Sequence, residues 1–221
     1  NHERAAEMRF WLGEFRFHVD PRVIVPRSYF AELLEDGFAP WIEEPEAVES
    51  ALDLCTGSGC LAILMAHAFP NAEVDAIDIS AEALEVARRN IADYGLEERV
   101  HAIESDLFAT VKKKRYDLII CNPPYVTAAA MDALPAEYRH EPALALAAGA
   151  DGLDVVRRIL AQAHKYLKPG GVLAIEVGHN QDLVTAAFPD LPAVWLDTAQ
   201  AEGKVFVLTR EDLPAAKSRG A

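Results

Sequence analysis

The sequence predicts an α/β fold in which a parallel β-sheet is covered by helices on both faces. From residue 48 onward, short segments rich in Val, Ile and Leu alternate with segments whose apolar residues recur at helical spacing. The short segments are continuously apolar, which is typical of strands buried on both faces. A closing pair of strands with no helix between them predicts one antiparallel strand near one edge of the sheet.

The segments before residue 48 follow another pattern. Residues 1–9 are expected to end a helix, and the segments 15–19 and 23–26 flank an Asp-Pro-Arg turn that predicts a β-hairpin. Ser28 is expected to cap a helix. The apolar face of that helix, at helical spacing, comprises Phe30, Leu33, Leu34, Phe38, Trp41 and Ile42.

Strands and helices then alternate along the rest of the chain. Ser80 is expected to cap a helix that Gly95 ends, and Pro169-Gly170-Gly171 to stop another. A long loop from 122 to about 150 is expected to be functional. The expected strands are 48–55, 73–79, 99–105, 116–121, 172–178, 193–198 and 204–210, and the other expected helices are 60–69, 151–167 and 181–188.

Composition narrows the class of protein. The 221 residues suit one globular domain, with or without a small appendage. No apolar run is long enough to span a membrane, and the N-terminus is too charged for a secretory signal. The formal net charge of −14 disfavours nucleic acid as a partner and favours a basic protein.

The cysteine and histidine residues predict no metal site. Cys55, Cys60 and Cys121 are an odd number without a signal peptide, which indicates reduced thiols in a cytoplasm. Their spacing fits no zinc site, and the seven His form no pair on a helix face.

The segment Asp53-Leu54-Cys55-Thr56-Gly57-Ser58-Gly59 follows the first buried strand and predicts a ligand-binding turn. Its glycines let the backbone turn tightly and approach a ligand, beside the free N–H groups of the next helix. Asp53 can reach a ligand's ammonium group. A nicotinamide dinucleotide is not excluded by this turn alone, because Ala62 is tolerated at the third glycine position of that fingerprint.

Two further aspartates follow the next two strands. Asp78, with Ile79 beside it, is placed to accept hydrogen bonds from both hydroxyls of a ribose. Asp106 is placed to accept from an adenine amino group, with Leu107 or Phe108 against the ring. Because the carboxyl ends of parallel strands meet at one edge, the three aspartates predict a single nucleoside site.

The tetrapeptide Asn122-Pro123-Pro124-Tyr125 follows the fourth strand and predicts a clamp for a planar –NH2 group. The Asn122 side-chain carbonyl and a backbone carbonyl freed by the Pro-Pro kink can accept both hydrogens. The Tyr125 ring can lie against the flat face of the group.

In this order, DLCTGSGC, Asp78, SDLF and NPPY resemble the class I S-adenosylmethionine-dependent methyltransferases. NPPY narrows the resemblance to members that methylate an amino or amide nitrogen. Glu141-Pro142 and the segment 147–153 are similar to the HemK-like protein-(glutamine-N5) methyltransferases. The segments 26–32 and 137–142 are closest to the branch that methylates a glutamine of large-subunit ribosomal protein L-three.

The resemblance implies a Rossmann-like seven-stranded sheet with one antiparallel strand, S-adenosylmethionine as donor and S-adenosylhomocysteine as product. It divides the chain into a β-hairpin with the remnant of an N-terminal helical segment (1–27), the methyltransferase domain (28–210) and a tail (211–221). The implied donor site comprises Asp53, Thr56, Gly57, Ser58, Gly59, Asp78, Ile79, Asp106, Leu107 and Asn122. The implied catalytic residues are Asn122, Pro123 and Tyr125, and the implied acceptor contacts are Arg27, Pro124 and Glu141.

The implied partner is a basic ribosomal protein, in the cytoplasm and away from membranes. The basic run Lys112–Arg115 is interpreted as a solvated loop, with contact to ribosomal RNA as the alternative. Three other functions stay open: methylation of peptide-chain release factors, adenine-N6 methylation of nucleic acid, and a non-catalytic role in ribosome assembly.

Overall fold

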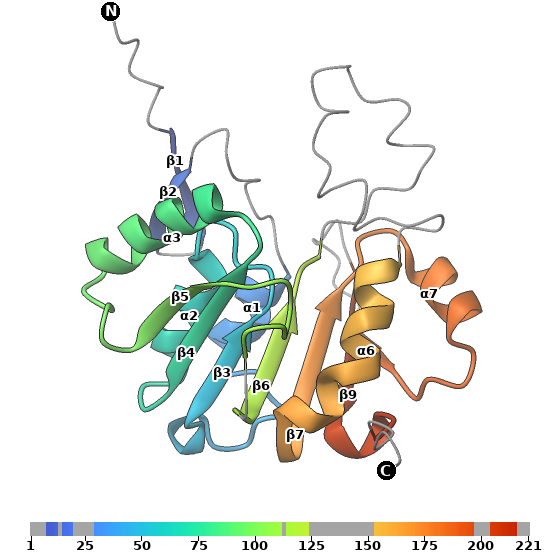
Figure 1. Cartoon of the computed structure of the whole chain (residues 1–221). Helices are drawn as coiled ribbons and strands as arrows, with labels where there is room; N and C mark the ends of the chain where they lie inside the picture. The colour runs from blue at the N-terminus through green and yellow to red at the C-terminus, as the bar shows by residue number, and fades with distance from the viewer. Residues whose placement is uncertain are drawn as a thin grey trace, which may run out of the picture.

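The computed structural model describes residues 8–12, 15–19, 29–111, 114–123, 153–196 and 204–215. These residues form a seven-stranded sheet with helices on both faces, and a separate two-stranded hairpin (Figure 1). The order across the large sheet is β5-β4-β3-β6-β7-β9-β8. Its strands are β3 (Ser50–Asp53), β4 (Glu73–Asp78), β5 (Val100–Glu104), β6 (Tyr116–Cys121), β7 (Leu167–Glu176), β8 (Val194–Leu196) and β9 (Val205–Thr209).

The strands of the large sheet run in the predicted relative directions. β6 is the central strand; β3 pairs in parallel with β4 and β6, while β4 pairs with β5 and β6 with β7 in the same sense. β9 runs antiparallel to both of its neighbours, β7 and β8. The prediction of an α/β sheet with one antiparallel strand is therefore confirmed, and that strand lies one place inside the edge.

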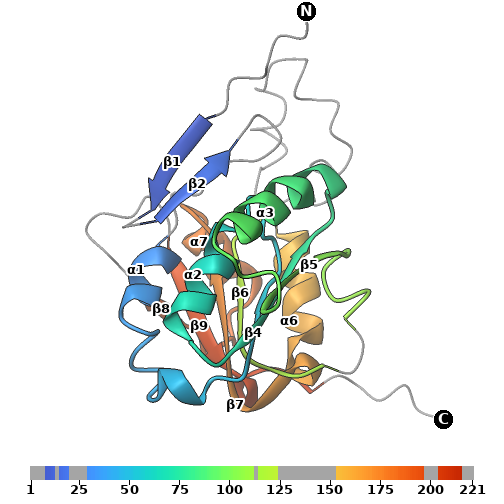
Figure 2. The same ribbon diagram turned by 90° about the vertical axis from the view of Figure 1, so that its left-hand side faces the viewer.

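Helices cover the two faces of the sheet as the apolar strands require (Figure 2). Successive side chains of β6 point to opposite faces, so that Leu118 and Ile120 join one core and Ile119 and Cys121 the other. α1 and α2 pack on the first core and α6 on the second. The helices are α1 (Phe30–Glu35), α2 (Cys60–Ala68), α3 (Ala81–Asp93), α6 (Asp154–Tyr166) and α7 (Gln181–Ala187), with 3-10 turns η1 (Pro45–Ala47) and η3 (Arg210–Asp212).

Helix ends are held by specific side chains. The Ser80 hydroxyl accepts the Ala83 backbone N–H at 3.1 Å, so α3 begins at the predicted cap. The Arg99 guanidinium donates from Nη2 to the carbonyls of Ala66, Phe69 and Ala72 at 2.9, 2.9 and 3.0 Å. These bonds join a carbonyl of the last turn of α2 to two carbonyls of the connection that leads to β4.

The hairpin differs from the prediction. β2 (Phe15–Val19) is a strand as expected, but it pairs antiparallel with β1 (Met8–Leu12), where the end of a helix was expected. Leu12 lies opposite Phe15, so only Gly13-Glu14 joins the two strands. The expected partner segment, 23–26, lies outside the described residues.

Two boundaries were also predicted wrongly. α1 ends at Glu35 rather than continuing to Ile42, because Gly37 and Phe38 both have a φ of 63°, which leaves the helical conformation. β7 begins at Leu167 and contains Pro169-Gly170-Gly171, where the strand was expected to start at 172. A register shift between the Tyr116 and Leu118 pairings accommodates these extra residues.

Lys114 does not lie in a purely solvated loop. Its ammonium donates to Asp75 Oδ2 at 2.9 Å, and the Tyr116 hydroxyl donates to the same oxygen at 2.6 Å. Asp75 is buried, so this part of the basic run contributes a partner to a buried carboxylate.

No helix in the described part of the chain combines the length and apolar character needed to cross a membrane.

Candidate active site

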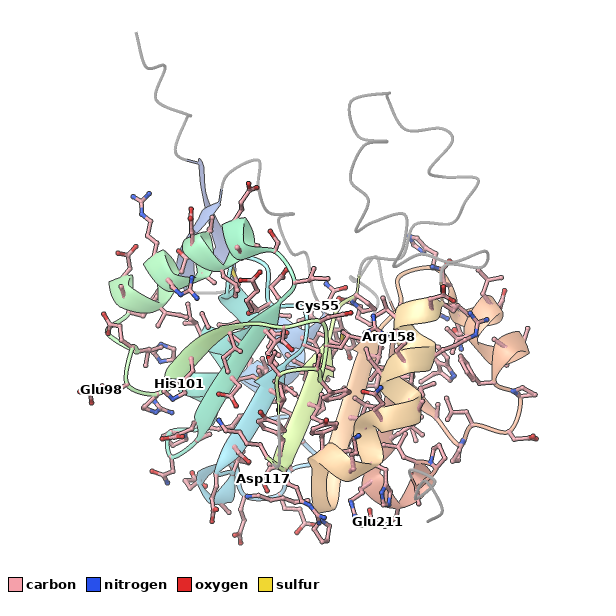
Figure 3. The ribbon with its side chains drawn as sticks, in the orientation of Figure 1. Cys55, Glu98, His101, Asp117, Arg158 and Glu211 are labelled. Carbon is pink, nitrogen blue, oxygen red and sulfur yellow. The ribbon has the colours of Figure 1, made fainter. Side chains whose placement is uncertain are left out.

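The predicted site residues lie at the carboxyl edge of the sheet. Asp53 closes β3, Asp78 closes β4, and Asn122 directly follows β6. These three strands are neighbours, so the structure brings the side chains to adjacent strand ends, as the sequence predicts. Figure 3 shows Cys55 and Arg158 at this end of the sheet and Asp117 at the opposite end. A hollow of about 240 Å³ beside Asp117 and Gly170 therefore does not belong to this site.

Asp53 is a fully buried carboxyl group. Neither of its oxygens, nor the hydroxyl of Thr56, makes a hydrogen bond within the described residues. Burial raises the pKa of Asp53 to about 7, and the charge of Asp78 adds to the shift, while the nearby Thr56 side chain and Cys55 backbone oppose it in part. A buried carboxylate without partners is unfavourable, so this position suits a ligand that brings a positive charge.

The glycine turn is open toward this edge. Thr56 donates its backbone N–H to the Ile77 carbonyl at 2.8 Å, which joins the turn to β4. Gly57 has a φ of 53°, and a Cβ added there would meet no atom within 4 Å. The backbone at Gly57 thus faces space that a ligand can enter.

Close packing against α3 fixes the other side of the turn. Gly59 has a φ of 81°, and a Cβ there would lie 3.1 Å from the Ala87 Cβ and 3.2 Å from its Cα. Buried Asn90 donates its side-chain N–H to the Ser58 carbonyl at 2.8 Å. The sequence analysis missed Asn90, although a polar residue beside Ile91 on the buried side of α3 was a usable signal.

Asp78 holds the turn as well as facing the site. Its Oδ2 accepts the Gly57 N–H and its Oδ1 accepts the Ser80 N–H, both at 2.9 Å. Burial raises the pKa of Asp78, and the backbone hydrogen bonds oppose the shift. Each carboxylate oxygen keeps a lone pair for a further donor. Ile79, next in the chain, is 56% exposed and presents apolar surface beside the carboxylate.

Asp106 lies after β5 and is half exposed. Its Oδ1 forms an ion pair of 2.9 Å with Arg158 Nη2 of α6, which the sequence did not predict. Leu107 is buried, with a φ of 50°. The expectation that Phe108 could lie against an adenine ring is wrong, because Phe108 is buried and stacks on Tyr166 at 4.3 Å.

Asn122 and Pro123 complete the described part of the site. Asn122 is half-buried and Pro123 is buried, directly after β6. On the next strand, buried Glu176 closes β7 and accepts the Tyr29 N–H at 3.0 Å, a tie that the sequence analysis missed. The other predicted site residues, Arg27, Pro124, Tyr125 and Glu141, lie outside the described residues.

This arrangement fits an aminoacyl nucleoside such as S-adenosylmethionine. The orphaned Asp53 carboxylate suits its ammonium group, the outward side of Asp78 suits a ribose diol, and Ile79 suits the face of a base. Among the described residues, no group of three or more His, Cys, Asp or Glu side chains could hold a metal ion.

Comparisons with known proteins identify the family of the chain. Residues 38–137 match the family model described as Methyltransferase small domain. The ribosomal protein uL3 glutamine methyltransferase of Bordetella pertussis (strain Tohama I) is 62% identical over 203 residues, which cover 92% of this chain and 68% of the relative. The enzyme of the same name from Neisseria gonorrhoeae (strain FA 1090) is 61% identical with the same coverage.

A solved structure supports the fold alone. The ribosomal protein L11 methylase from Lactobacillus delbrueckii subsp. bulgaricus superposes with a TM-score of 0.58 at 19% identity, covering 86% of this chain and 82% of that one. Identity to the uL3 enzymes, by contrast, extends over nearly the whole chain and includes the segments around the candidate site. The chain belongs to the family of ribosomal protein uL3 glutamine methyltransferases.

Proposed function

We propose that this protein transfers a methyl group from S-adenosylmethionine to the side-chain amide nitrogen of a glutamine in ribosomal protein uL3. One observation carries the proposal: the buried, unpaired carboxylate of Asp53 lies one strand away from Asn122-Pro123, the start of the amide clamp. Relatives that are 62% and 61% identical to this chain bear the name of that activity.

The donor is held by the ends of three strands. Asp53 pairs with the ammonium group, Asp78 accepts from the ribose hydroxyls, and the free oxygen of Asp106 accepts from the adenine amino group. Ile79, next in the chain to Asp78, is exposed and offers apolar surface to the base, while Leu107, next to Asp106, is buried. Gly57 leaves room for the aminoacyl part. When bound, S-adenosylmethionine supplies an electrophilic methyl group on a sulfonium centre.

The glutamine amide nitrogen is made reactive by hydrogen bonds that orient it, without a general base. An amide nitrogen is a weak nucleophile, because its lone pair is delocalised into the carbonyl. Asn122 Oδ1 and the Pro123 carbonyl accept its two N–H bonds, which draws electron density onto nitrogen and directs the lone pair toward the donor. Tyr125 packs against the amide plane. No strong base is needed, because the nitrogen loses its proton easily once it is alkylated.

Charge complementarity supports a ribosomal protein as acceptor. The chain carries a formal net charge of −14, and ribosomal proteins are generally basic. Attraction between opposite net charges raises the rate of encounter. A nucleic acid acceptor would be repelled by the same charge.

The test of the mechanism is Asn122→Ala. We expect methyl transfer to purified uL3 to fall about 10²- to 10³-fold, the scale of losing one preorganised polar contact. Donor affinity, measured by calorimetry, should change much less. Asn71→Ala is the matched control, since Asn71 donates to the Glu46 carbonyl away from the site. Near-normal turnover of the Asn122 variant would refute the proposed clamp.

The identity of the acceptor is tested separately. The protein is incubated with labelled donor and either uL3 or a peptide-chain release factor, and the methylated residue is located by mass spectrometry. We expect label on a glutamine of uL3. Label on the release factor alone would assign the sibling activity, and donor binding without transfer to either would indicate a non-catalytic role.

A further inference from the structure

Two thiols meet at the carboxyl ends of neighbouring strands, within the site but without a role in the proposed transfer. Cys121, the last residue of β6, is fully buried, and Cys55, two residues beyond β3, is half-buried. Their sulfur atoms lie 3.4 Å apart. The Leu54 N–H donates to the Ile120 carbonyl at 3.0 Å, so the strand pairing continues up to this point and holds the two sulfurs together.

The third cysteine, Cys60, contacts Ser58 and not the other two thiols. The sequence contains three cysteines, and Cys60 lies at the start of α2 with its sulfur 2.7 Å from the Ser58 hydroxyl. It is buried, and burial raises the pKa of its thiol to about 12. Cys55 and Cys121 are therefore the pair that the fold sets up for a reaction with each other.

We propose that Cys55 and Cys121 are a modification site, at which a hydroperoxide such as hydrogen peroxide converts the thiol pair to a disulfide and arrests methyl transfer. Cys55 is the thiol that solvent reaches first, since Cys121 is fully buried. Burial raises the pKa of Cys121 well above its usual range, which disfavours its direct reaction with peroxide, whereas its sulfur lies 3.4 Å from that of Cys55, where the second step takes place.

The two steps balance. The Cys55 sulfur attacks the O–O bond of hydrogen peroxide, becomes a sulfenic acid and releases one water. The Cys121 sulfur then attacks the Cys55 sulfur, the S–S bond forms, and the sulfenic hydroxyl leaves with the Cys121 proton as a second water. Peroxide is thus reduced to two waters while two thiols are oxidised to one disulfide.

The disulfide between Cys55 and Cys121 must displace residues of both the donor turn and the acceptor clamp. A disulfide requires an S–S distance of about 2.05 Å, so the sulfurs must approach by more than 1 Å. Asn122 follows Cys121 directly, and Thr56 of the glycine turn follows Cys55. The displacement therefore acts on the acceptor clamp and the donor turn together. A misplacement of about 1 Å in an active site lowers the rate on the order of 10²-fold.

The test begins on the protein alone. The full chain is reduced, treated with a small excess of hydrogen peroxide and digested without reductant. We expect mass spectrometry to find the Cys55 and Cys121 peptides cross-linked, with a loss of two hydrogens, and dithiothreitol to separate them. This result does not depend on which protein is the acceptor, so its failure is distinguishable from failure of the proposed function.

Activity and matched variants complete the test. The rate of methyl transfer by the cross-linked protein should be at least tenfold lower than that of the reduced protein. Treatment with dithiothreitol should restore the rate. Cys60→Ala should still cross-link, whereas Cys55→Ser and Cys121→Ala should not. Loss of free thiols in the wild-type protein without this cross-link would overturn the proposal, as would a cross-linked protein with unchanged methyl transfer.

Discussion

Replacement of Asp53 by Asn should stabilise the ligand-free protein, and more so at alkaline pH. Burial raises the pKa of Asp53 from 3.8 to about 7. Since one pKa unit corresponds to about 1.4 kcal/mol, ionising Asp53 destabilises the folded state by about 4 kcal/mol. Between these two pKa values the folded state binds more protons than the unfolded state, so stability falls as pH rises through this window and then levels off.

Asn is neutral and similar in shape to protonated Asp, so it removes this dependence. The free energy of unfolding of Asp53→Asn, minus that of the wild type, should increase by about 2.5 kcal/mol between pH 5 and pH 8. For a chain of this length the increase corresponds to roughly 5–10 °C in Tm. Urea unfolding without ligand at both pH values measures it.

Asp154→Asn controls for the loss of one formal charge, because the Asp154 carboxylate is exposed. The same Asp53→Asn protein should bind S-adenosylmethionine more weakly, since an amide cannot pair with an ammonium group. A stability difference that does not change between pH 5 and pH 8 would contradict the buried, unpaired state of Asp53.

Other substitutions test the supports of the site. Asp78→Ala should weaken donor affinity at least tenfold in calorimetry, because the ribose acceptor and the bond to Gly57 are both lost; unchanged affinity would remove Asp78 from the site. Gly59→Ala should destabilise the protein by about 1–3 kcal/mol in urea unfolding, because the added Cβ meets Ala87 and the φ of 81° disfavours a side chain. Arg99→Met should lower the free energy of unfolding by about 2–3 kcal/mol, because three carbonyls lose a charged donor. An effect below about 0.5 kcal/mol is the size of an ordinary surface substitution and would show that water replaces the guanidinium.

The parallel strands and the position of the site could be predicted from the sequence because both depend on local patterns. A short run such as YDLIIC, with two adjacent Ile residues, favours a strand buried on both faces, and β6 has the predicted bounds. Polar residues directly after such runs must meet at the carboxyl edge, as Asp53, Asp78 and Asn122 do. The family prediction is confirmed by relatives that match nearly the whole chain.

What the sequence did not reveal depends on contacts between distant segments. The bond from Asn90 to Ser58 spans 32 residues, and that from Tyr29 to Glu176 spans 147. The early end of α1 depends on two residues with positive φ, of which only Gly37 is a recognisable signal. The roles assigned to the site residues, including Arg27, Pro124, Tyr125 and Glu141, and the division of the chain into segments, stay predictions.

The place of β9 has a consequence for how the polypeptide folds as it is synthesised. β9 (Val205–Thr209) is the last strand in the described part of the chain, yet it lies between β7 and β8. Until it leaves the ribosome, residues 172–176 of β7 present an unpaired edge, and β8 pairs with none of the described strands. The nascent chain must hold the site-bearing strands with that edge open, so pairing with another chain competes with folding until the final strand arrives.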